Sequence, residues 1–346
     1  MSDNGGDAGG AGGMGGTGGG GGGSGGAGGV TGAAGQPGGQ PGGQEAGQNP
    51  NPNAGGAEPP QPPQQELISA KLSENVSKLE AVFRDCDDFH LVSWKLGDER
   101  KVEAAAFFFE SLTYNQSRPD VAREILNDLI RHEALGGKEL AAADLAAFLN
   151  EHGVPATNAL LVSTLEDVQR QVLSGKVVVM LDGWDRAIVF DAGNPESRSI
   201  SEPINESVIA GPHVGTVEDL KKNVGLLRSR LKTPAFKLKQ VETGGQTKAS
   251  VVYGYIDGIV DPQLLQEFQR RIEQIRDKEI LEVSYVEEWL EDETYSPFPQ
   301  FRVTERPDTA VAAMLSGKII VLVQGTGTIL ICPGLFVEFF QSSEDY

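Results

Sequence analysis

Apolar residues recur along the first part of the chain at two different spacings. In ELISAKLSENVSKLEAVF they stand three or four positions apart, which predicts an amphipathic helix over 66–84. The segment FHLVSWKLGDERKVEAAAFFF predicts two strands, joined in a hairpin at Gly97-Asp98. Helical spacing returns from Pro119 onward and again in AAADLAAFLNEHG. The pattern therefore predicts a helix, a hairpin and two more helices in that order.

A further helix is predicted over about 165–174, and two strands follow it. Ser163 and Glu166 have the spacing of a capping box at its start. The apolar strand 176–181 comes directly after the helix, and DGWD then turns the chain into a second strand, RAIVF. This part therefore predicts a second hairpin.

The same order returns after residue 234. The segment FKLKQVETGGQTKASVVYGYI predicts two strands around a Gly-Gly turn. Asp261 and Pro262 are a typical helix start, and another helix is predicted over about 279–291. RPDTAVAAML predicts a third helix with Pro307 in its first turn, followed by the strand KIIVLV, a QGTG turn and the strand TILIC.

Two nearly identical runs decide how this repetition is interpreted. Residues 173–183 read LSGKVVVMLDG and residues 315–325 read LSGKIIVLVQG, 142 residues apart. A phosphate-binding loop needs a strand followed by the N-terminus of a helix, whereas each run here leads from a helix into a strand. Gly175 and Gly317 therefore predict helix C-caps with positive φ, and the two runs indicate an internal duplication.

The first 65 residues differ in composition from the rest of the chain. They are dominated by Gly, Pro and Gln, which cannot bury enough apolar surface to offset the entropy of ordering. We therefore expect an α/β fold with two similar subdomains, each a small mixed β-sheet of two hairpins covered by helices, preceded by a disordered tail. The predicted divisions are the tail 1–65, a first subdomain 66–212, a connecting helix 213–231 and a second subdomain 232–346.

The formal net charge of −20 argues against nucleic acid as a partner, because an acidic surface repels phosphate backbones. The two cysteines, Cys86 and Cys332, have no disulfide or metal spacing and are predicted to be buried thiols. The printed sequence has neither a signal-peptide pattern nor an apolar run of about 18 residues. These features predict a chain that is soluble by itself.

Catalytic, cofactor and metal motifs are missing from the sequence. The four histidines are too far apart for a metal site, and no nucleophile elbow is present. Asp182, Asp185 and Asp257 stand at strand ends, where we interpret them as turn residues. The one basic stretch, LKKNVGLLRSRLK, suits the C-terminal end of a helix near 217–231, with membrane contact as the alternative. We therefore predict no enzyme and no cofactor.

The segment YSPFPQFRVTERPD, 295–308, is predicted to be a long irregular stretch. Its prolines favour an extended loop, and an apolar residue between them is typical of a docking contact. Two interpretations stay open, a loop packed on its own domain and a contact surface for another protein. The candidate partner-contact residues are Pro297, Phe298, Pro299, Glu305 and Arg306.

At this point the sequence resembles a known family. The elements SPFPQ, TERPD and FFQSSEDY, in this order and spacing, closely resemble the soluble N-terminal region of the A subunit of GerA-type spore germination receptors. YIDGIVDPQLLQEFQRRI, MLDGWDRAIVF and SEPINESVIAGPHVGTVEDLKKNVGLLRSRLKTP are similar to that family as well. The resemblance covers about 160–346 well and 75–160 more loosely, and the glycine-rich tail lies outside it.

The resemblance implies a function that the residues alone do not. It implies a non-catalytic regulatory and assembly domain of a nutrient-responsive receptor, with B and C subunits and further A-subunit copies as partners. A membrane channel domain is expected after Tyr346, in the spore inner membrane. The lack of an export signal favours the cytoplasmic (core) side for this part. The first alternative is a small-molecule binding module that uses the groove between the subdomains, and the second is an unrecognised enzyme.

Overall fold

The computed structural model describes residues 66–97, 102–113, 118–131, 142–152, 159–191, 214–244, 246–291 and 300–334. The predicted tail lies outside the described residues, so its disorder stays a prediction. Residues 61–346 form one compact unit, which contains two five-stranded sheets. We call the described residues of 66–191 the first repeat and those of 214–334 the second repeat.

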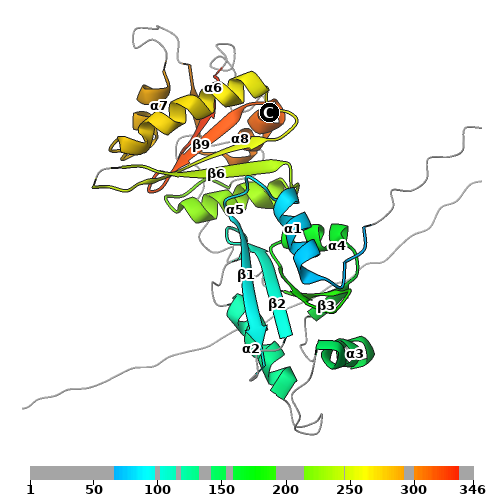
Figure 1. The fold of residues 1–346 in the computed structure, drawn as a ribbon. Helices are drawn as coiled ribbons and strands as arrows, with labels where there is room; N and C mark the ends of the chain where they lie inside the picture. The colour runs from blue at the N-terminus through cyan, green and yellow to red at the C-terminus, as the bar shows by residue number, and fades with distance from the viewer. Residues whose placement is uncertain are drawn as a thin grey trace, which may run out of the picture. The chain divides into compact units, whose positions relative to one another are not determined.

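The first repeat is a three-layer arrangement of helices around one sheet (Figure 1). Its strands lie in the order β1-β2-β4-β5-β3, and every pair is antiparallel. Helices α1 and α4 share one apolar core with one face of the sheet, and α2 and α3 share another core with the opposite face. The elements are α1 Leu72–Val82, β1 Phe89–Leu96, β2 Val102–Phe109, α2 Arg118–Arg131, α3 Ala142–His152, β3 Ala159–Val162, α4 Leu165–Val172, β4 Val177–Leu181 and β5 Ala187–Phe190.

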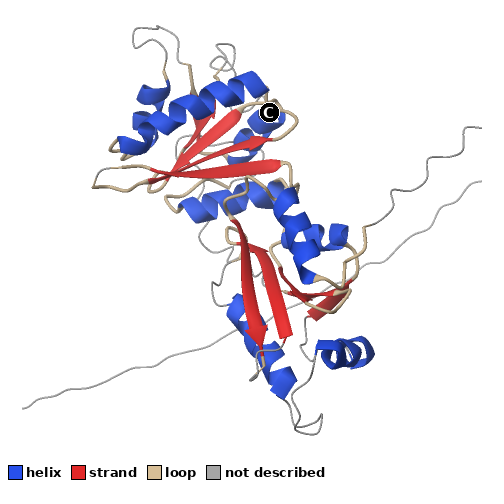
Figure 2. Ribbon diagram, viewed as in Figure 1, coloured by secondary structure: helices blue, strands red, loops and turns tan. Residues whose placement is uncertain are grey.

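The second repeat has the same layers (Figure 2). Its strands follow the order β6-β7-β9-β10-β8, again fully antiparallel. Helices α5 and α8 pack on one face of this sheet, and α6, η3 and α7 pack on the other. The elements are α5 Leu220–Arg230, β6 Phe236–Glu242, β7 Ser250–Ile256, α6 Pro262–Ile272, η3 Glu273–Asp277, α7 Val283–Leu290, β8 Arg302–Thr304, α8 Pro307–Leu315, β9 Ile319–Val323 and β10 Ile329–Cys332.

The predicted fold class of two similar α/β subdomains is confirmed, with two corrections to its sheets. The sheets are antiparallel rather than mixed, because each added hairpin pairs with the last strand of the hairpin before it. Each sheet also has a fifth, short edge strand, β3 or β8. Strand β8 lies inside the stretch that the sequence predicted to be irregular, where Arg302–Thr304 pair with β10. The predicted domain boundaries stay a prediction.

Both LSGK runs are helix C-caps, as the sequence predicted. Gly175 has a φ of 82° and Gly317 a φ of 84°, the left-handed region that glycine adopts at least cost. In both, the amide of the lysine after the glycine donates back to a carbonyl in the last helical turn, which is the Schellman pattern. The two runs therefore end helices rather than bind phosphate.

The predicted capping box at Ser163 is wrong by one residue. The N-cap of α4 is Thr164, whose side chain accepts a hydrogen bond from the amide of Asp167. The carbonyl of Ser163 instead accepts a hydrogen bond from the amide of Ile68, and Ser163 lies one position before the N-cap. Glu166 accepts from the amide of Glu66 and so joins the chain before α1 to α4.

Helices α1 and α5 occupy equivalent places in the two repeats. The side-chain amide of Asn75 accepts a hydrogen bond from the amide of Ser69 and donates one to its carbonyl. Asn223 in α5 forms the same pair of bonds with Val217, also six residues earlier. Helix α5, within the predicted connecting segment, thus begins the second repeat as α1 begins the first.

Candidate functional site

The two repeats meet at Arg228, a side chain of α5 that is entirely buried. Its Nε and Nη2 donate to the two carboxylate oxygens of Asp88, at 3.0 and 2.7 Å, and its Nη1 donates to the carbonyl of Phe236 at 2.8 Å. The rings of Phe109 and Phe236 lie 4.3 and 4.6 Å from the guanidinium carbon. Arginine suits this place because its planar group can bind a carboxylate with two bonds and stack on aromatic rings.

The electrostatics of this pair favour its charged form. Burial by itself lowers the pKa of Arg228, but the charge and hydrogen bonds of Asp88 raise it above its usual value. Asp88 also accepts a hydrogen bond from the hydroxyl of Ser111 at 2.7 Å. We call Arg228, Asp88, Phe109 and Phe236 the clamp, since they join a helix of the second repeat to the first.

A short backbone pairing continues the junction along the edge strand β6. The amide of Asp87 donates to the carbonyl of Leu238 at 2.8 Å, and the amide of Leu238 donates to Asp85 at 2.9 Å. Cys86 forms a parallel bridge with Leu238 between these bonds. The carboxylate of Asp87 then accepts from the amide of Gln240 and from Lys239. Residues Asp85–Asp87 therefore cover part of this edge through a single β-bridge.

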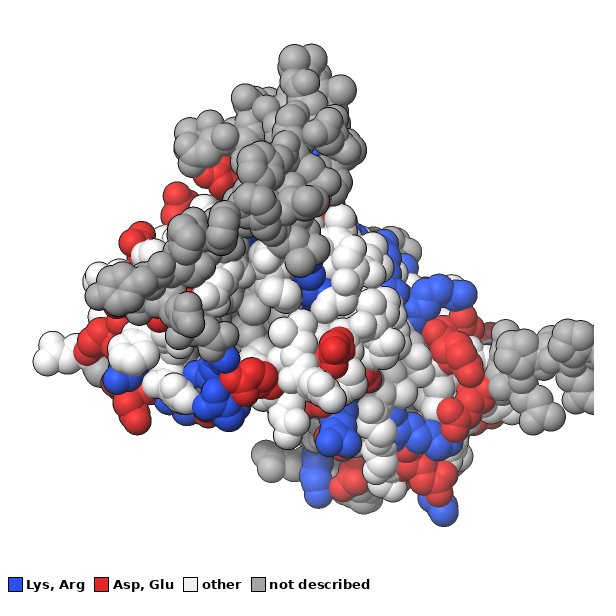
Figure 3. All heavy atoms as spheres, turned by 90° about the horizontal axis from the view of Figure 1, so that it is seen from above, with Lys and Arg blue, Asp and Glu red and all other residues white. Residues whose placement is uncertain are grey.

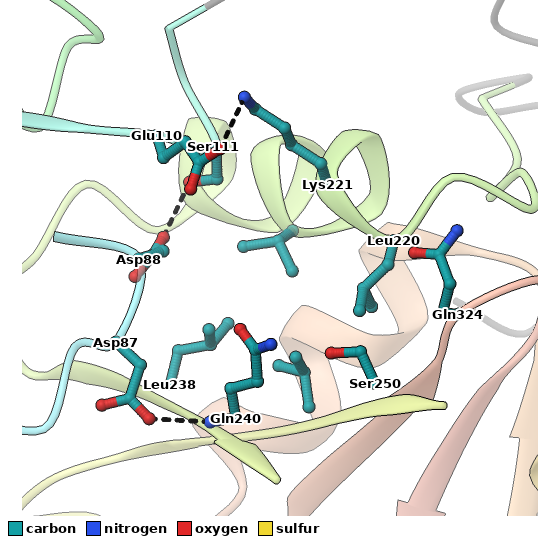
Figure 4. Close-up of a pocket in the computed structure, with 12 residues that line it drawn as sticks. Asp87, Asp88, Glu110, Ser111, Leu220, Lys221, Leu238, Gln240, Ser250 and Gln324 are labelled. Carbon is teal, nitrogen blue, oxygen red and sulfur yellow. Dashed lines mark hydrogen bonds and ion pairs between the residues drawn. The ribbon is translucent and has the colours of Figure 1, made fainter. Parts of the chain in front are cut away.

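A cavity of about 190 Å³ lies beside the clamp, between α5 and strands β6 and β7 (Figure 4). One part of its wall is apolar: Leu220, Val224, Leu238 and Val252. The rest is polar and comes from both repeats: Asp87, Asp88, Glu110, Ser111, Lys221, Gln240, Ser250 and Gln324. In Figure 4 the hydroxyl of Ser250 and the side-chain amide of Gln240 point into this space.

The acidic groups of the cavity have cationic partners. Glu110 accepts a hydrogen bond from Lys221 at 3.1 Å, and its other oxygen lies 3.0 Å from His90. Although burial raises the pKa of Glu110, Lys221 and then His90 lower it below its usual value. Lys239 lies 3.1 Å from Asp87, and Arg228 binds Asp88. The charges that surround the cavity therefore cancel in pairs.

The candidate partner-contact residues are only partly described. Pro297, Phe298 and Pro299 lie outside the described residues. Arg306 is 5% exposed, and its guanidinium donates to Asp308 within the first turn of α8. The carbonyl of Glu305 accepts from the amide of Thr216, which ties the segment before α5 to the segment before α8. Arg306 thus contributes to packing in its own repeat, while a partner contact by the whole set stays a prediction.

The basic stretch of α5 has a structural role that the sequence did not reveal. Lys221 and Arg228 both bind acidic residues of the first repeat, so these two charges are not available to a membrane. On the face shown in Figure 3, basic and acidic side chains alternate over the described surface without a basic patch. His90 is hydrogen-bonded to Glu110, whereas His132 and His213 lie outside the described residues, and the side chain of His152 is not described.

The described residues lack the features of a metal site and of a membrane span. They contain no group of three His, Cys, Asp or Glu side chains that could hold a metal ion. Within them, no helix is both long and apolar enough to cross a bilayer. Burial raises the pKa of the Cys86 thiol and raises that of Cys332 to about 12, so both stay protonated at neutral pH.

Comparison with known proteins identifies similar chains. The family model described as Bacillus/Clostridium GerA spore germination protein matches residues 77–346. The uncharacterized membrane protein YfkQ of Bacillus subtilis is 32% identical over 289 residues, 82% of this chain and 53% of that protein. Spore germination protein KA of the same organism is 31% identical over 280 residues, 81% of this chain and 50% of that protein. The chain thus spans about half the length of the curated relatives it matches.

A solved structure has the same fold. The crystal structure of the N-terminal domain of the A subunit of the Bacillus megaterium spore germinant receptor GerK3 aligns with a TM-score of 0.58 and 26% identity. The alignment covers 79% of this chain and 98% of that domain. The two-repeat arrangement is therefore shared with an A-subunit N-terminal domain over nearly its whole length.

Proposed function

Since the chain belongs to the family of Bacillus/Clostridium GerA spore germination proteins, we propose that it is a non-catalytic regulatory and assembly region of a nutrient-responsive germination receptor. The observation that carries this proposal is the fold match, which extends over 98% of the N-terminal domain of a receptor A subunit. The acidic residues at the junction support a non-catalytic role, because Asp87, Asp88 and Glu110 are each engaged in an ion pair that joins the repeats.

The proposed partners are B and C receptor subunits and further copies of the A subunit. We also propose a membrane channel domain after Tyr346, which would attach this region to the spore inner membrane on its core side. Two observations support the membrane part of the proposal. The relatives are about twice as long as the region they share with this chain, and one of them is named a membrane protein.

The proposed contact surface is Pro297–Pro299, which the sequence predicts to lie in a loop, with Phe298 as its apolar anchor. Interfaces gain most of their binding energy from a few such anchors. Phe301, two residues after this loop, is a suitable packing control because it is 5% exposed and belongs to the core between the sheet and α7. The two phenylalanines therefore separate contact from stability.

The test compares Phe298→Ser with Phe301→Ser in the 346-residue chain and in a full-length subunit in spores. We expect Phe298→Ser to change the free energy of unfolding by less than about 1 kcal/mol. It should also reduce recovery of the B and C subunits with the full-length protein and slow nutrient-triggered germination. Phe301→Ser should destabilise the chain by about 3–5 kcal/mol.

Two results would reject the contact surface. If Phe298→Ser unfolds the chain as Phe301→Ser does, the loop is packed on its own domain. If Phe298→Ser spares stability, subunit recovery and germination alike, the loop does not contact a partner.

The cavity between the repeats favours a second candidate function, a small-molecule binding module. Its wall combines an apolar part with convergent polar groups, which is typical of ligand sites. We do not propose the enzyme alternative.

A further inference from the structure

We propose that the outer side of helix α7 is a docking surface for a basic amphipathic helix of another protein. We call this surface the aromatic face and define it as Leu281, Tyr285 and Trp289. It lies on the opposite side of the second sheet from α5 and the clamp (Figure 1). The inference goes beyond the proposed function, which assigns no contact to α7. Exposure, helix geometry and charge carry it.

The aromatic face exposes large apolar side chains close together. Tyr285 is 37% exposed and Trp289 is 40% exposed, while Leu281, two residues before the helix, is 59% exposed. They are three of the ten large apolar side chains exposed within the described residues, and all three lie between 281 and 289. Single exposed apolar side chains are ordinary, whereas a cluster of them typically marks a contact surface.

The counterpart helix of the first repeat shows that the fold does not require this face. Helix α3 reads AADLAAFLNEH and contains neither tyrosine nor tryptophan. Both helices bury a leucine near their C-terminal end, Leu149 in α3 and Leu290 in α7. The buried side is therefore common to both repeats, while the exposed rings are found in α7 and not in α3.

The geometry of the aromatic face suits another helix. The inner side of α7 is buried through Val283, Val286 and Leu290. Tyr285 and Trp289 are four residues apart, so their rings lie one turn apart along the outer side. A narrow apolar row of this kind packs against the apolar side of a second helix. Tyrosine and tryptophan are also the residues that most often dominate the binding energy of an interface.

The charges around the face are negative. Helix α7 reads VSYVEEWL and contains two glutamates and no basic residue. Glu288 borders Tyr285, and Glu287 and Glu291 stand one turn apart on the flank. None of the three has a cationic partner among the described residues. Burial and then the charge of Glu291 raise the pKa of Glu287 above its usual value, so a cation on this flank would relieve a repulsion.

The basic side chains beside the face are already engaged. The Nζ of Lys278 lies 4.1 Å from the centre of the Trp289 ring, which shows that this ring attracts a cation. Arg271 donates to Glu267 and to the carbonyl of Leu290. The negative charge on the flank of α7 is therefore available to a partner.

This charge selects the occupant. A second copy that docked through the same face would bring identical glutamates together, because a two-fold contact pairs a surface with itself. Anionic lipid headgroups would be repelled in the same way. A helix with leucines on one side and lysines on its flanks complements both the apolar row and the glutamates.

The experiment titrates the 346-residue chain with synthetic peptides about 16 residues long, or roughly four helical turns. The first peptide has leucines on one side of the helix and lysines on the other. The second has glutamates in place of the lysines, and the third has the composition of the first in an order without an apolar side. We expect the first to bind with a Kd on the order of 10 μM and the others about tenfold more weakly or less.

Trp289 reports binding at the aromatic face directly. Of the three tryptophans, Trp94 and Trp184 are buried, so Trp289 is the exposed one. A helix packed on the face removes its ring from water. The fluorescence emission should therefore shift to shorter wavelength, and quenching by acrylamide should decrease. A peptide bound elsewhere on this acidic chain would leave both signals unchanged.

Variants measured by calorimetry locate the surface. Trp289→Ala should weaken binding of the first peptide about thirtyfold, as is typical of an aromatic anchor. Leu315→Ala is the matched control, since Leu315 is 54% exposed on α8, and it should leave binding unchanged. Glu288→Gln should weaken binding about threefold at low salt and reduce its salt dependence. Glu80→Gln, at an exposed position of α1, should not. If Trp289→Ala does not fold, Tyr285→Ala serves the same purpose.

Contrary results would overturn the surface or its occupant. Equal binding of the first and third peptides would reduce the effect to a general attraction of charges. Tighter binding of the second peptide would show that the partner is not basic. A shift of Trp289 emission on phosphatidylcholine–phosphatidylserine vesicles would replace the helix by a membrane, and a dimer that Trp289→Ala abolishes would replace it by a second copy. If no peptide binds, the docking surface is rejected, while the receptor role is still decided by subunit recovery and germination.

Discussion

Helices α1 and α5 have the same position in their repeats but opposite surroundings. Both are fixed by an asparagine that hydrogen-bonds the backbone six residues earlier. Five residues after this asparagine, α1 carries Glu80, which is exposed, and α5 carries Arg228, which is fully buried. The residue just before each, Leu79 or Leu227, is fully buried in both helices.

The comparison teaches which features belong to the repeat and which to the junction. The inward leucine and the asparagine serve the core of a single repeat, so both copies have them. The position held by Glu80 in α1 and Arg228 in α5 contacts the other repeat only in α5. There, Asp88 and two phenylalanine rings surround the arginine. The same helix is therefore a surface element in the first repeat and an internal one in the second.

The largest effect is expected from removing the carboxylate of the clamp. Asp88→Ala leaves the buried guanidinium of Arg228 without its counter-charge, which typically costs about 3–5 kcal/mol. Glu80→Ala, at the exposed equivalent of Arg228, should change the free energy of unfolding by less than about 0.5 kcal/mol. Urea unfolding measures both. Equal effects of the two substitutions would remove the distinction between α1 and α5.

Removing the asparagine of α1 or of α5 should lower the free energy of unfolding by the same amount in both repeats. Asn75→Ala and Asn223→Ala each remove two hydrogen bonds and leave a backbone amide and carbonyl unpaired. We expect each to lower the free energy of unfolding by about 2–3 kcal/mol. Thermal unfolding of the two variants checks this. A loss at only one site would mean that the asparagine is not a feature of the repeat.

The third effect tests the two helix caps. Gly175→Ala and Gly317→Ala force an L-residue into positive φ, at a cost of about 1–2 kcal/mol. In each, the new Cβ would also lie 3.2 Å from a backbone oxygen, of Leu112 or of Ile259.

Gly258→Ala is the matched control for the caps. Gly258 has a φ of 80°, but a Cβ there would meet no atom within 4 Å. Its variant should therefore be destabilised by the φ cost alone, and less than both cap variants in the same melting experiment. A control variant that loses as much stability as the caps would show that the close contacts do not matter.

The smallest effect on the free energy of unfolding is expected at the ion pair of Glu110 with Lys221, and it depends on pH. The pKa of Glu110 is below its usual value in the folded chain, so this group stabilises the fold above its unfolded pKa. That contribution is lost as the pH falls through the lowered folded pKa, below about 4.5. Glu110→Gln should therefore cost about 0.5 kcal/mol at neutral pH, a value typical of partly exposed pairs. The difference from the parent should shrink on acidification.

Glu103→Gln provides the matched comparison in a urea titration at several pH values. Glu103 pairs with Lys95 inside one hairpin, where both side chains are more than half exposed. Its variant should follow the parent throughout. If Glu110→Gln also follows the parent at neutral pH, Lys221 does not stabilise the junction.

Features with a local cause were predicted correctly from the sequence. The hairpins, the start of α6 at Asp261 and Pro262 and the two glycine caps follow from neighbouring residues alone. Strands β3 and β8 were missed because four and three residues are too short to show an alternation. The N-cap of α4 was misplaced because Ser163 and Thr164 are adjacent hydroxyl residues, and a distant backbone bond decides between them.

The candidate site lay beyond such local signals. Asp88 and Arg228 are 140 residues apart, and the arginine stands in a stretch whose basic residues fit a helix C-terminus equally well. The residues of the cavity come from six separate segments of the chain. The sequence did predict a groove between the subdomains as a possible ligand site, which the position of the cavity matches. Its polar lining could not be predicted, because the residues that form it come together only in the folded structure of both repeats.

The clamp also bears on how the chain assembles during synthesis. Asp88 and Phe109 leave the ribosome well before Arg228, so the first repeat can fold while its docking surface is still in water. Until residues Asp85–Asp87 cover it, strand β6 is an open sheet edge, the kind of surface that pairs with foreign strands. Contacts between such distant residues form more slowly than hairpins. We therefore expect docking of the repeats to be the last step of folding and the moment at which misassembly is most costly.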